Sequence, residues 1–249
     1  MRSRYWMTTA ASVGAILALV SALIGVLKSD LFVLRVVEIS GLPSPSPVSA
    51  ERILELSQIK VDESSLFEVN LGNIRSRITE EPWVESVLLE RKFPHTLSVQ
   101  LHLRRPIALE QNAAGALRYM DRTANSYAPF EPEMGYLLPV LVGIPEDRLA
   151  RAITFLKTWE EHNVRLQASI SQMTWDRERG FRTLIRTGVV ARMQRSWLEL
   201  GDLMLENDTR VLLDRLINVL SYVDQHQFKI QNIFADLDKK MVVRLEDHP

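Results

Sequence analysis

Residues 81–108 read EPWVESVLLERKFPHTLSVQLHLRRPIA, and this stretch decides the fold of the first folded part of the chain. Its patterning predicts two strands, 84–91 and 96–103, joined by a turn at 93–95. Apolar and polar side chains alternate along the second strand: Leu97, Val99, Leu101 and Leu103 against Ser98, Gln100 and His102. This period of two predicts a sheet with one buried face and one wet face.

Upstream of this hairpin, the sequence predicts one further strand and two short helices. Residues 31–39 are rich in Leu, Phe and Val and end before Gly41, as expected of a strand. Three prolines exclude helix and ladder from the loop 42–47. Ser49 is placed to cap a helix, and apolar spacing predicts a second helix at 71–79. The expected order is therefore β-α-α-β-β.

Downstream, Arg105-Pro106 marks the expected start of a second, mixed β domain with two longer helices. Helical spacing of apolar residues predicts those helices at 146–162 and 208–226. The strands are predicted at 107–110, 117–120, 127–128, 170–175, 181–186, 189–193, 197–200, 230–237 and 241–245, and residues 138–141 lead to Gly143. The fold class is α+β.

The N-terminal region contains an uncharged run, residues 8–27, that predicts a membrane-spanning helix. Twenty residues at about 1.5 Å each give roughly 30 Å, the thickness of the hydrocarbon core. Arg2 and Arg4 precede the run, so the positive-inside rule places residues 1–7 in the cytoplasm and the body outside. A cleaved signal peptide is the alternative, but the run is long and lacks a small-x-small cleavage site.

Composition argues against several classes of function. The chain has 249 residues, 46% hydrophobic and 24% charged, as a globular body requires. A net charge of −1 gives a nucleic-acid partner no electrostatic support, and we expect none. The chain contains no cysteine, which excludes disulfides, thiol nucleophiles and cysteine metal sites.

No pattern in the sequence predicts catalysis. The five histidines are scattered without metal-ligand spacing, and no nucleophile elbow or phosphate loop occurs. Asp236 and Asp238 could form a carboxylate pair, but two positions near a strand end are better explained as solvent-facing or turn-forming. We therefore expect no enzyme activity, no cofactor and no metal site.

An ordered set of motifs resembles the FtsQ/DivIB cell-division proteins. These motifs are residues 37–41 (VEISG), 65–70 (SLFEVN), 81–84 (EPWV), 90–97 (ERKFPHTL), 103–108 (LRRPIA), 138–143 (LPVLVG) and 233–237 (IFADL). The resemblance implies a POTRA domain at 31–104 and an FtsQ-type β domain at 105–249. Four residues carry the POTRA signature in a structural role, with Trp83 expected to pack under the hairpin: Pro82, Trp83, Arg91 and Pro94.

The resemblance also implies a role and partners. It indicates a single-pass protein of the inner membrane at the division septum, held in the lipid bilayer by residues 8–27. Its β domain would bind FtsB and FtsL outside the membrane, and its POTRA domain would dock other divisome membrane proteins. Two other functions are open: docking in another envelope export or assembly machine, and an anchored hydrolase. The first would need further long alternating strands and the second a catalytic cluster.

The last predicted strand, 241–245 (MVVRL), is the expected partner site. A terminal strand often lies at a sheet edge, where unpaired backbone groups can accept a strand from another chain. The alternative is an edge covered internally or by Glu246-Asp247. The residues predicted to bind the partner are Met241, Val242, Val243, Arg244, Leu245, Phe234 and Asp236.

Two basic pairs, Arg91-Lys92 and Arg104-Arg105, suggest a basic cluster near the hairpin. A solvated surface is the simpler interpretation. Contact with anionic lipid headgroups is the alternative, because the predicted span lies so close to the POTRA domain.

Overall fold

The structure is a computed structural model and describes residues 16–21, 25, 30–166, 168–187, 194–201, 206–226, 228–235 and 240–245. It divides into two compact units between Arg104 and Arg105. Each unit has its own sheets and helices and is described separately below.

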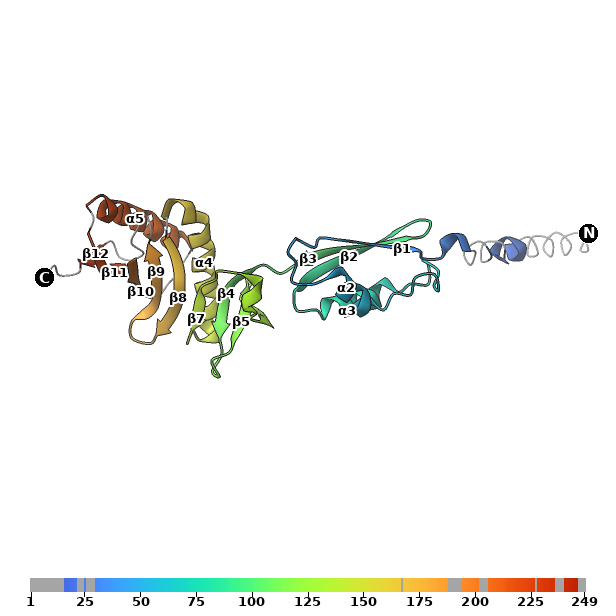
Figure 1. Cartoon of the computed structure of the whole chain (residues 1–249), viewed down its shortest axis with the longest axis horizontal. Helices are drawn as coiled ribbons and strands as arrows, with labels where there is room; N and C mark the ends of the chain where they lie inside the picture. Colours follow the sequence, from blue (N-terminus) through green and yellow to red (C-terminus); the bar gives the residue numbers. More distant parts are fainter. Residues whose placement is uncertain are drawn as a thin grey trace, which may run out of the picture. The chain divides into compact units, whose positions relative to one another are not determined.

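The first unit is a three-stranded sheet with two helices on one face (Figure 1). The strand order is β1-β3-β2, with β1 parallel and β2 antiparallel to the central β3. The elements follow in the expected order: η1 (Asp30–Phe32), β1 (Val36–Ser40), α2 (Ala50–Ser57), α3 (Leu71–Thr79), β2 (Val84–Lys92) and β3 (Thr96–Leu103).

The first strand is shorter than the sequence predicts. A strand was expected over 31–39, yet β1 begins only at Val36. The preceding residues bond to a loop instead of to a strand: the Leu34 N–H donates to the Ser64 carbonyl at 3.0 Å, and the Leu66 N–H donates to the Phe32 carbonyl at 2.7 Å. Their apolar character therefore reflects packing against residues 62–66.

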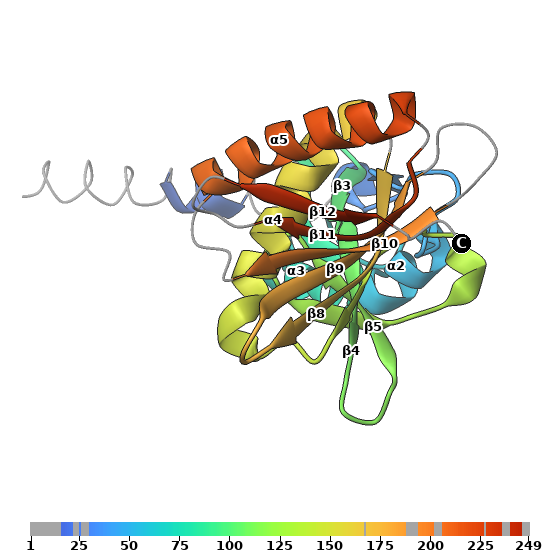
Figure 2. The same ribbon diagram turned by 90° about the vertical axis from the view of Figure 1, so that its left-hand side faces the viewer.

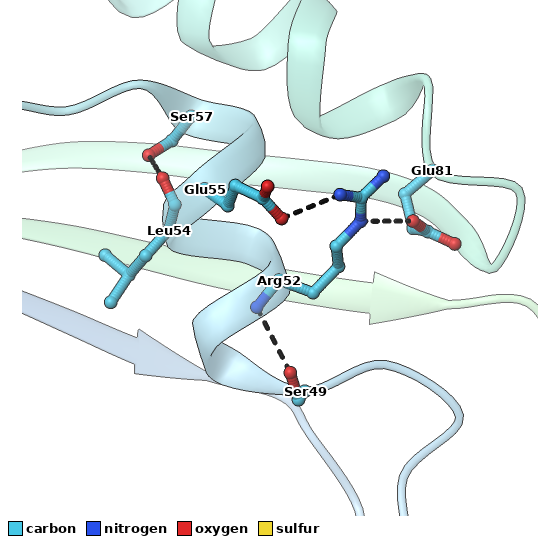
Figure 3. Close-up of polar contacts among 6 residues, drawn as sticks. All are labelled: Ser49, Arg52, Leu54, Glu55, Ser57 and Glu81. Carbon is cyan, nitrogen blue, oxygen red and sulfur yellow. Dashed lines mark hydrogen bonds and ion pairs between the residues drawn. The ribbon is translucent and has the colours of Figure 1, made fainter.

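Helix α2 is fixed by its cap and by one arginine (Figure 3). The Ser49 hydroxyl accepts the Arg52 N–H at 3.1 Å, which satisfies one of the donors that a helix start leaves unpaired. The Arg52 guanidinium reaches the Glu55 carboxylate at 2.7 Å and the Glu81 carboxylate at 3.7 Å. Arg52 thereby connects α2 to the segment that leads into β2.

Gly41 allows β1 to end against β3. Its φ of +88° is in the region that favours glycine, and a Cβ there would lie 2.0 Å from the Leu101 carbonyl oxygen. Any side chain at this position would therefore collide with the backbone of the central strand.

The second unit is a nine-stranded mixed sheet in the order β12-β11-β10-β9-β8-β7-β4-β5-β6 (Figure 1). Its strands are β4 (Pro106–Gln111), β5 (Leu117–Asp121), β6 (Ser126–Pro129), β7 (Val140–Val142), β8 (Ala168–Asp176), β9 (Gly180–Thr187), β10 (Gln194–Gly201), β11 (Ile230–Ala235) and β12 (Met241–Leu245). Its helices are η2 (Pro132–Met134), α4 (Glu146–Leu166) and α5 (Glu206–Gln225). The strand predicted at 189–193 lies outside the described residues.

Helices α4 and α5 lie side by side against one face of this sheet (Figures 1 and 2). Strand residues alternate accordingly, and Phe181, Ile185 and Leu198 are fully buried beneath the helices. Leu213 and Ile217 of α5 also join the core, beside the apolar stripe of Leu212, Leu216, Val219, Leu220 and Val223 that marks this helix in the sequence. A wider stripe is what a helix needs when it packs on both a sheet and a second helix.

The predicted membrane span falls mostly on residues that the structure does not describe. Of residues 8–27, the structure describes 16–21 and 25, all helical. Among the described residues, no helix is both long enough and apolar enough to cross a bilayer.

Candidate docking site

Strand β12 forms one edge of the nine-stranded sheet. It pairs antiparallel with β11, with Phe234 opposite Val242 and Ile233 opposite Val243. Within the part of the chain that the structure describes, β11 is its only strand neighbour. One row of its backbone N–H and C=O groups therefore faces away from the sheet, as at any edge strand. We call this side of β12 the β12 edge.

The side chains of β12 divide between the two faces of the sheet. Met241 and Val243 pack against the core that the helices cover. Val242 is 57% exposed on the other face, opposite the 37% exposed Phe234. Apolar surface thus lies directly beside the β12 edge, together with the exposed Leu245.

One residue of the predicted partner site, Asp236, falls on a part of the chain that the structure does not describe. Asp238 also lies outside the described residues. The same holds for Glu246-Asp247, which were considered as a cover for the edge. The predicted residues that the structure does describe, 241–245 and Phe234, come together on two neighbouring strands.

The opposite edge, β6, is arranged differently. The Phe130 N–H donates to the Leu117 carbonyl at 3.0 Å, so Phe130 faces β5. By the alternation of an antiparallel pair, the backbone groups of Pro129 then face outward. The pairing shifts register between Ala128 and Ser126, at Tyr127. Pro129 has no N–H to offer, and the Arg118 guanidinium donates to the Tyr127 carbonyl at 2.9 Å. Strand β6 therefore lacks the outward N–H of Pro129, and its Tyr127 carbonyl is already bonded to a side chain.

Aromatic rings pack beneath the β6 edge. Tyr119 is fully buried, and its ring lies 5.6–6.1 Å from those of Tyr127, Phe130 and Tyr136. Its hydroxyl donates to the Glu131 carbonyl at 3.0 Å. Removal from water disfavours the phenolate, so burial raises the pKa of Tyr119 above its usual value of 10.0. Sequence reasoning missed this cluster because its members are spread over a strand, a hairpin and a loop.

The four POTRA signature residues take distinct positions in the first unit. Trp83 is 6% exposed, and its carbonyl accepts the Arg104 N–H at 2.8 Å. The Arg91 guanidinium donates to the carbonyls of Leu66 at 2.8 Å and Val69 at 2.7 Å. Pro82 and Pro94 are exposed at the two ends of β2. Arg91 thus holds the loop that joins the two helices against the hairpin.

The prediction of a single basic cluster near the hairpin, made of Arg91-Lys92 and Arg104-Arg105, is wrong. Lys92 and Arg104 lie at opposite ends of β3, because Lys92 pairs with Thr96 while Arg104 follows Leu103. An eight-residue strand separates them by about 25 Å. Lys92 also forms an ion pair with Glu38 at 2.7 Å. The four basic residues therefore do not form one surface.

The described residues contain no group of three or more acidic or histidine side chains that could hold a metal ion. Two histidines lie close to helix carbonyls four residues earlier. The Nδ1 of His162, in α4, lies 2.8 Å from the Thr158 carbonyl, and that of His226, just after α5, lies 2.8 Å from the Tyr222 carbonyl.

Comparison with known proteins agrees with this architecture. The profile of the family described as "POTRA domain, FtsQ-type" matches residues 32–102, which is nearly all of the first unit outside its N-terminal segment. The chain is 28% identical over 220 residues to the cell division protein FtsQ of Anaeromyxobacter sp. (strain K), covering 84% of this chain and 69% of that protein. Residues 32–102 thus match an FtsQ-type POTRA domain, and the chain is similar to FtsQ cell-division proteins over most of its length.

Other FtsQ proteins are similar over shorter stretches. The FtsQ of Geobacter sp. (strain M21) is 27% identical over 174 residues, covering 66% of this chain and 61% of that protein. The FtsQ of Corynebacterium glutamicum is 34% identical over 105 residues, covering 41% of this chain and 45% of that protein. Since the Anaeromyxobacter alignment covers 84% of the chain, it extends beyond the first unit into the nine-stranded sheet.

Proposed function

We propose that this chain is a non-catalytic scaffold of the bacterial divisome, anchored by residues 8–27 in the inner membrane at the division septum. Its body lies on the extracytoplasmic side. The β12 edge accepts a strand of FtsB, which brings FtsL with it, and the POTRA domain contacts other divisome membrane proteins. The observation that carries the proposal is the apolar strand β12, which among the described residues pairs with a strand on one side only.

The anchor is supported by the sequence and by the few residues described there. Residues 8–27 carry no charge, and the described part is helical with Ile16, Leu17 and Leu19 each more than 60% exposed. Such surface is stable when lipid covers it. Confinement to the membrane raises the effective concentration of partners, so modest affinities suffice for recruitment.

The docking mechanism is strand addition. A partner strand would bond to the outward backbone groups of β12, which gives affinity with little dependence on sequence. Val242 and Phe234 would supply apolar contacts on the exposed face and so add selectivity. Binding would add a partner strand beside β12 and cover the backbone groups of the β12 edge.

Paired proline variants test this mechanism. Neighbouring residues of a strand point their N–H groups in opposite directions, so one of Val242 and Val243 donates to β11 and the other faces outward. Proline at the outward position removes a donor for the partner and leaves the β11–β12 ladder intact. We expect one of Val242→Pro and Val243→Pro to keep the melting temperature while losing binding to the extracytoplasmic segment of FtsB, measured by calorimetry.

Val243→Thr is the matched control, because it keeps the N–H and the β-branched shape while changing one methyl to a hydroxyl. It should retain most of the binding. If both proline variants fold and bind the FtsB segment normally, strand addition at β12 is refuted.

The cellular role has a separate test. A fluorescent fusion of the full chain should concentrate at midcell in dividing cells, and the proline variant should still do so if the POTRA domain recruits it. A uniform envelope signal from the unmodified chain would point to another envelope machine.

A further inference from the structure

We propose that the phenylalanine cluster of Phe32, Phe67 and Phe93 seats the end of the first unit in the interfacial layer of the lipid bilayer. The ring centroids lie 5.0 Å apart for Phe32 and Phe67, 5.1 Å for Phe67 and Phe93, and 6.2 Å for Phe32 and Phe93. Phe67 is 40% exposed, Phe93 is 57% exposed, and the neighbouring Leu31 is 60% exposed. This inference rests on the membrane anchor of the proposed function.

The cluster is a fixed platform. Its three rings come from η1, from the loop after α2 and from the β2–β3 turn, and hydrogen bonds join these segments. The Leu66 N–H donates to the Phe32 carbonyl at 2.7 Å, and the Arg91 Nε donates to the Leu66 carbonyl at 2.8 Å. The Arg35 N–H donates to the His95 carbonyl at 2.9 Å. Because these hydrogen bonds hold the backbone, a local rearrangement cannot withdraw the rings from water.

The position of the cluster specifies the bilayer as its occupant. Val36 pairs with Thr96, so the β2–β3 turn that carries Phe93 lies at the end of the sheet where the chain enters. The uncharged run ends at residue 27, five residues before Phe32. Five residues span at most about 18 Å, which keeps the cluster within reach of the headgroup region. A protein partner at this end would have to share that space with lipid.

Apolar burial, and not charge, would hold this surface. Asp30 and Glu68 lie at the same end of the unit as Arg35 and Lys92, and Lys92 is already paired with Glu38 at 2.7 Å. Mixed charges give no net attraction to anionic headgroups, whereas Phe and Leu side chains enter the boundary between headgroups and acyl chains. The surface should therefore dock equally on neutral and anionic lipid, and added salt should not release it.

The experiment uses the full chain in phosphatidylcholine vesicles. Because the chain has no cysteine, Glu68→Cys carries the only thiol and can take an environment-sensitive fluorophore beside the intact rings. Ser86→Cys is the matched control, since this exposed residue pairs with His102 toward the far end of the hairpin. We expect spin-labelled lipid to quench the label at position 68 but not the label at position 86, at low and high salt alike.

Adding Phe67→Ser and Phe93→Ser to the Glu68→Cys chain should reduce the docked-to-undocked ratio about fivefold for each ring. Both side chains are substantially exposed, so the melting temperature should change little. Quenching that is unchanged in this variant would overturn the proposal, because proximity alone would then explain the signal.

Flotation of the vesicles separates this inference from the anchor. Chain that fails to float with the vesicles refutes the anchor and the seating together. Chain that floats while position 68 is as weakly quenched as position 86 leaves the anchor standing and refutes the seating, and the rings would then belong to a protein contact.

Discussion

The two edge strands of the nine-stranded sheet, β6 and β12, differ in the backbone groups and apolar side chains that they offer to another strand. At β6, Pro129 lacks a donor, and Arg118 occupies the carbonyl of Tyr127 at 2.9 Å. At β12, the neighbouring apolar side chains Val242 and Phe234 remain 57% and 37% exposed. Natural sheets generally block both edges because an open one invites association. A sheet that blocks one edge and leaves apolar surface beside the other is suited to accept a strand at one place.

The first expected effect, and the largest, tests whether both edges depend on one core. Leu198 is fully buried in β10, and the same core reaches from β4 to β12. Leu198→Ala should lower the free energy of unfolding of the second unit by about 2–5 kcal/mol. Hydrogen exchange should then show protection falling in β5 and β11 together. Loss of protection in β11 with unchanged protection in β5 would mean that the two edges belong to separate cooperative units.

Leu97→Ala is the control for this change. Leu97 is fully buried in β3 of the first unit. Its truncation should lower protection in β2 and β3 while that of β5 and β11 stays as it was.

The second prediction concerns a substitution that should close the β12 edge to a partner strand. Val242→Lys places a charge beside β12, the device by which natural edge strands discourage pairing. Affinity for the FtsB segment should fall about tenfold, while the free energy of unfolding stays within about 0.5 kcal/mol because Val242 is exposed. Leu88→Lys, an exposed apolar position on β2, is the matched control and should leave this affinity unchanged. Equal affinity for both variants would place the partner elsewhere.

Much of this fold could be predicted from the sequence because the patterns are local. Alternation in 96–103 gave β3 at the expected bounds, and the cap at Ser49 and the spacing of 71–79 gave both short helices. The prediction of a strand at 31–39 was wrong for the residues before Val36. Apolar composition does not distinguish a segment that pairs with a strand from one that packs on a loop. Before Val36, the Leu34 N–H bonds to Ser64.

The difference between the edges could be predicted only in part. Terminal position and β-prone residues indicated 241–245 as an edge strand. The blocking of β6 depends on Arg118 reaching the carbonyl of Tyr127 and on the direction in which Pro129 faces. Both depend on strand register, which a short run such as 127–128 does not specify. The phenylalanine cluster was missed for the same reason, since its three rings come from separate segments.

The third expected effect concerns the support of the closed edge. Tyr119→Phe removes the hydrogen bond to the Glu131 carbonyl and should cost about 1 kcal/mol of unfolding free energy at neutral pH. Because burial raises the pKa of Tyr119, the unfolded chain loses the phenolic proton first as pH rises. This part of the stability is therefore present below about pH 10 and declines above it.

Denaturation of both proteins from neutral to strongly alkaline pH measures this component. The difference in unfolding free energy between them should shrink above the usual tyrosine pKa, because only the unmodified chain has a phenol at this position. A constant difference across the range would show that the hydroxyl of Tyr119 ionises as readily in the folded state as in the unfolded one.

The smallest effect is expected from substitutions that should open the β6 edge to another strand. Pro129→Thr restores an outward N–H, and Arg118→Ala frees the Tyr127 carbonyl from its guanidinium partner. Both residues are exposed, so together they should change the unfolding free energy by less than about 1 kcal/mol. The second unit would then carry unblocked strands at both ends, and sedimentation should detect weak, concentration-dependent association that neither single variant shows. A strictly monomeric double variant would mean that something other than Pro129 and Arg118 protects β6, and the aromatic rings around Tyr119 would be the next feature to remove.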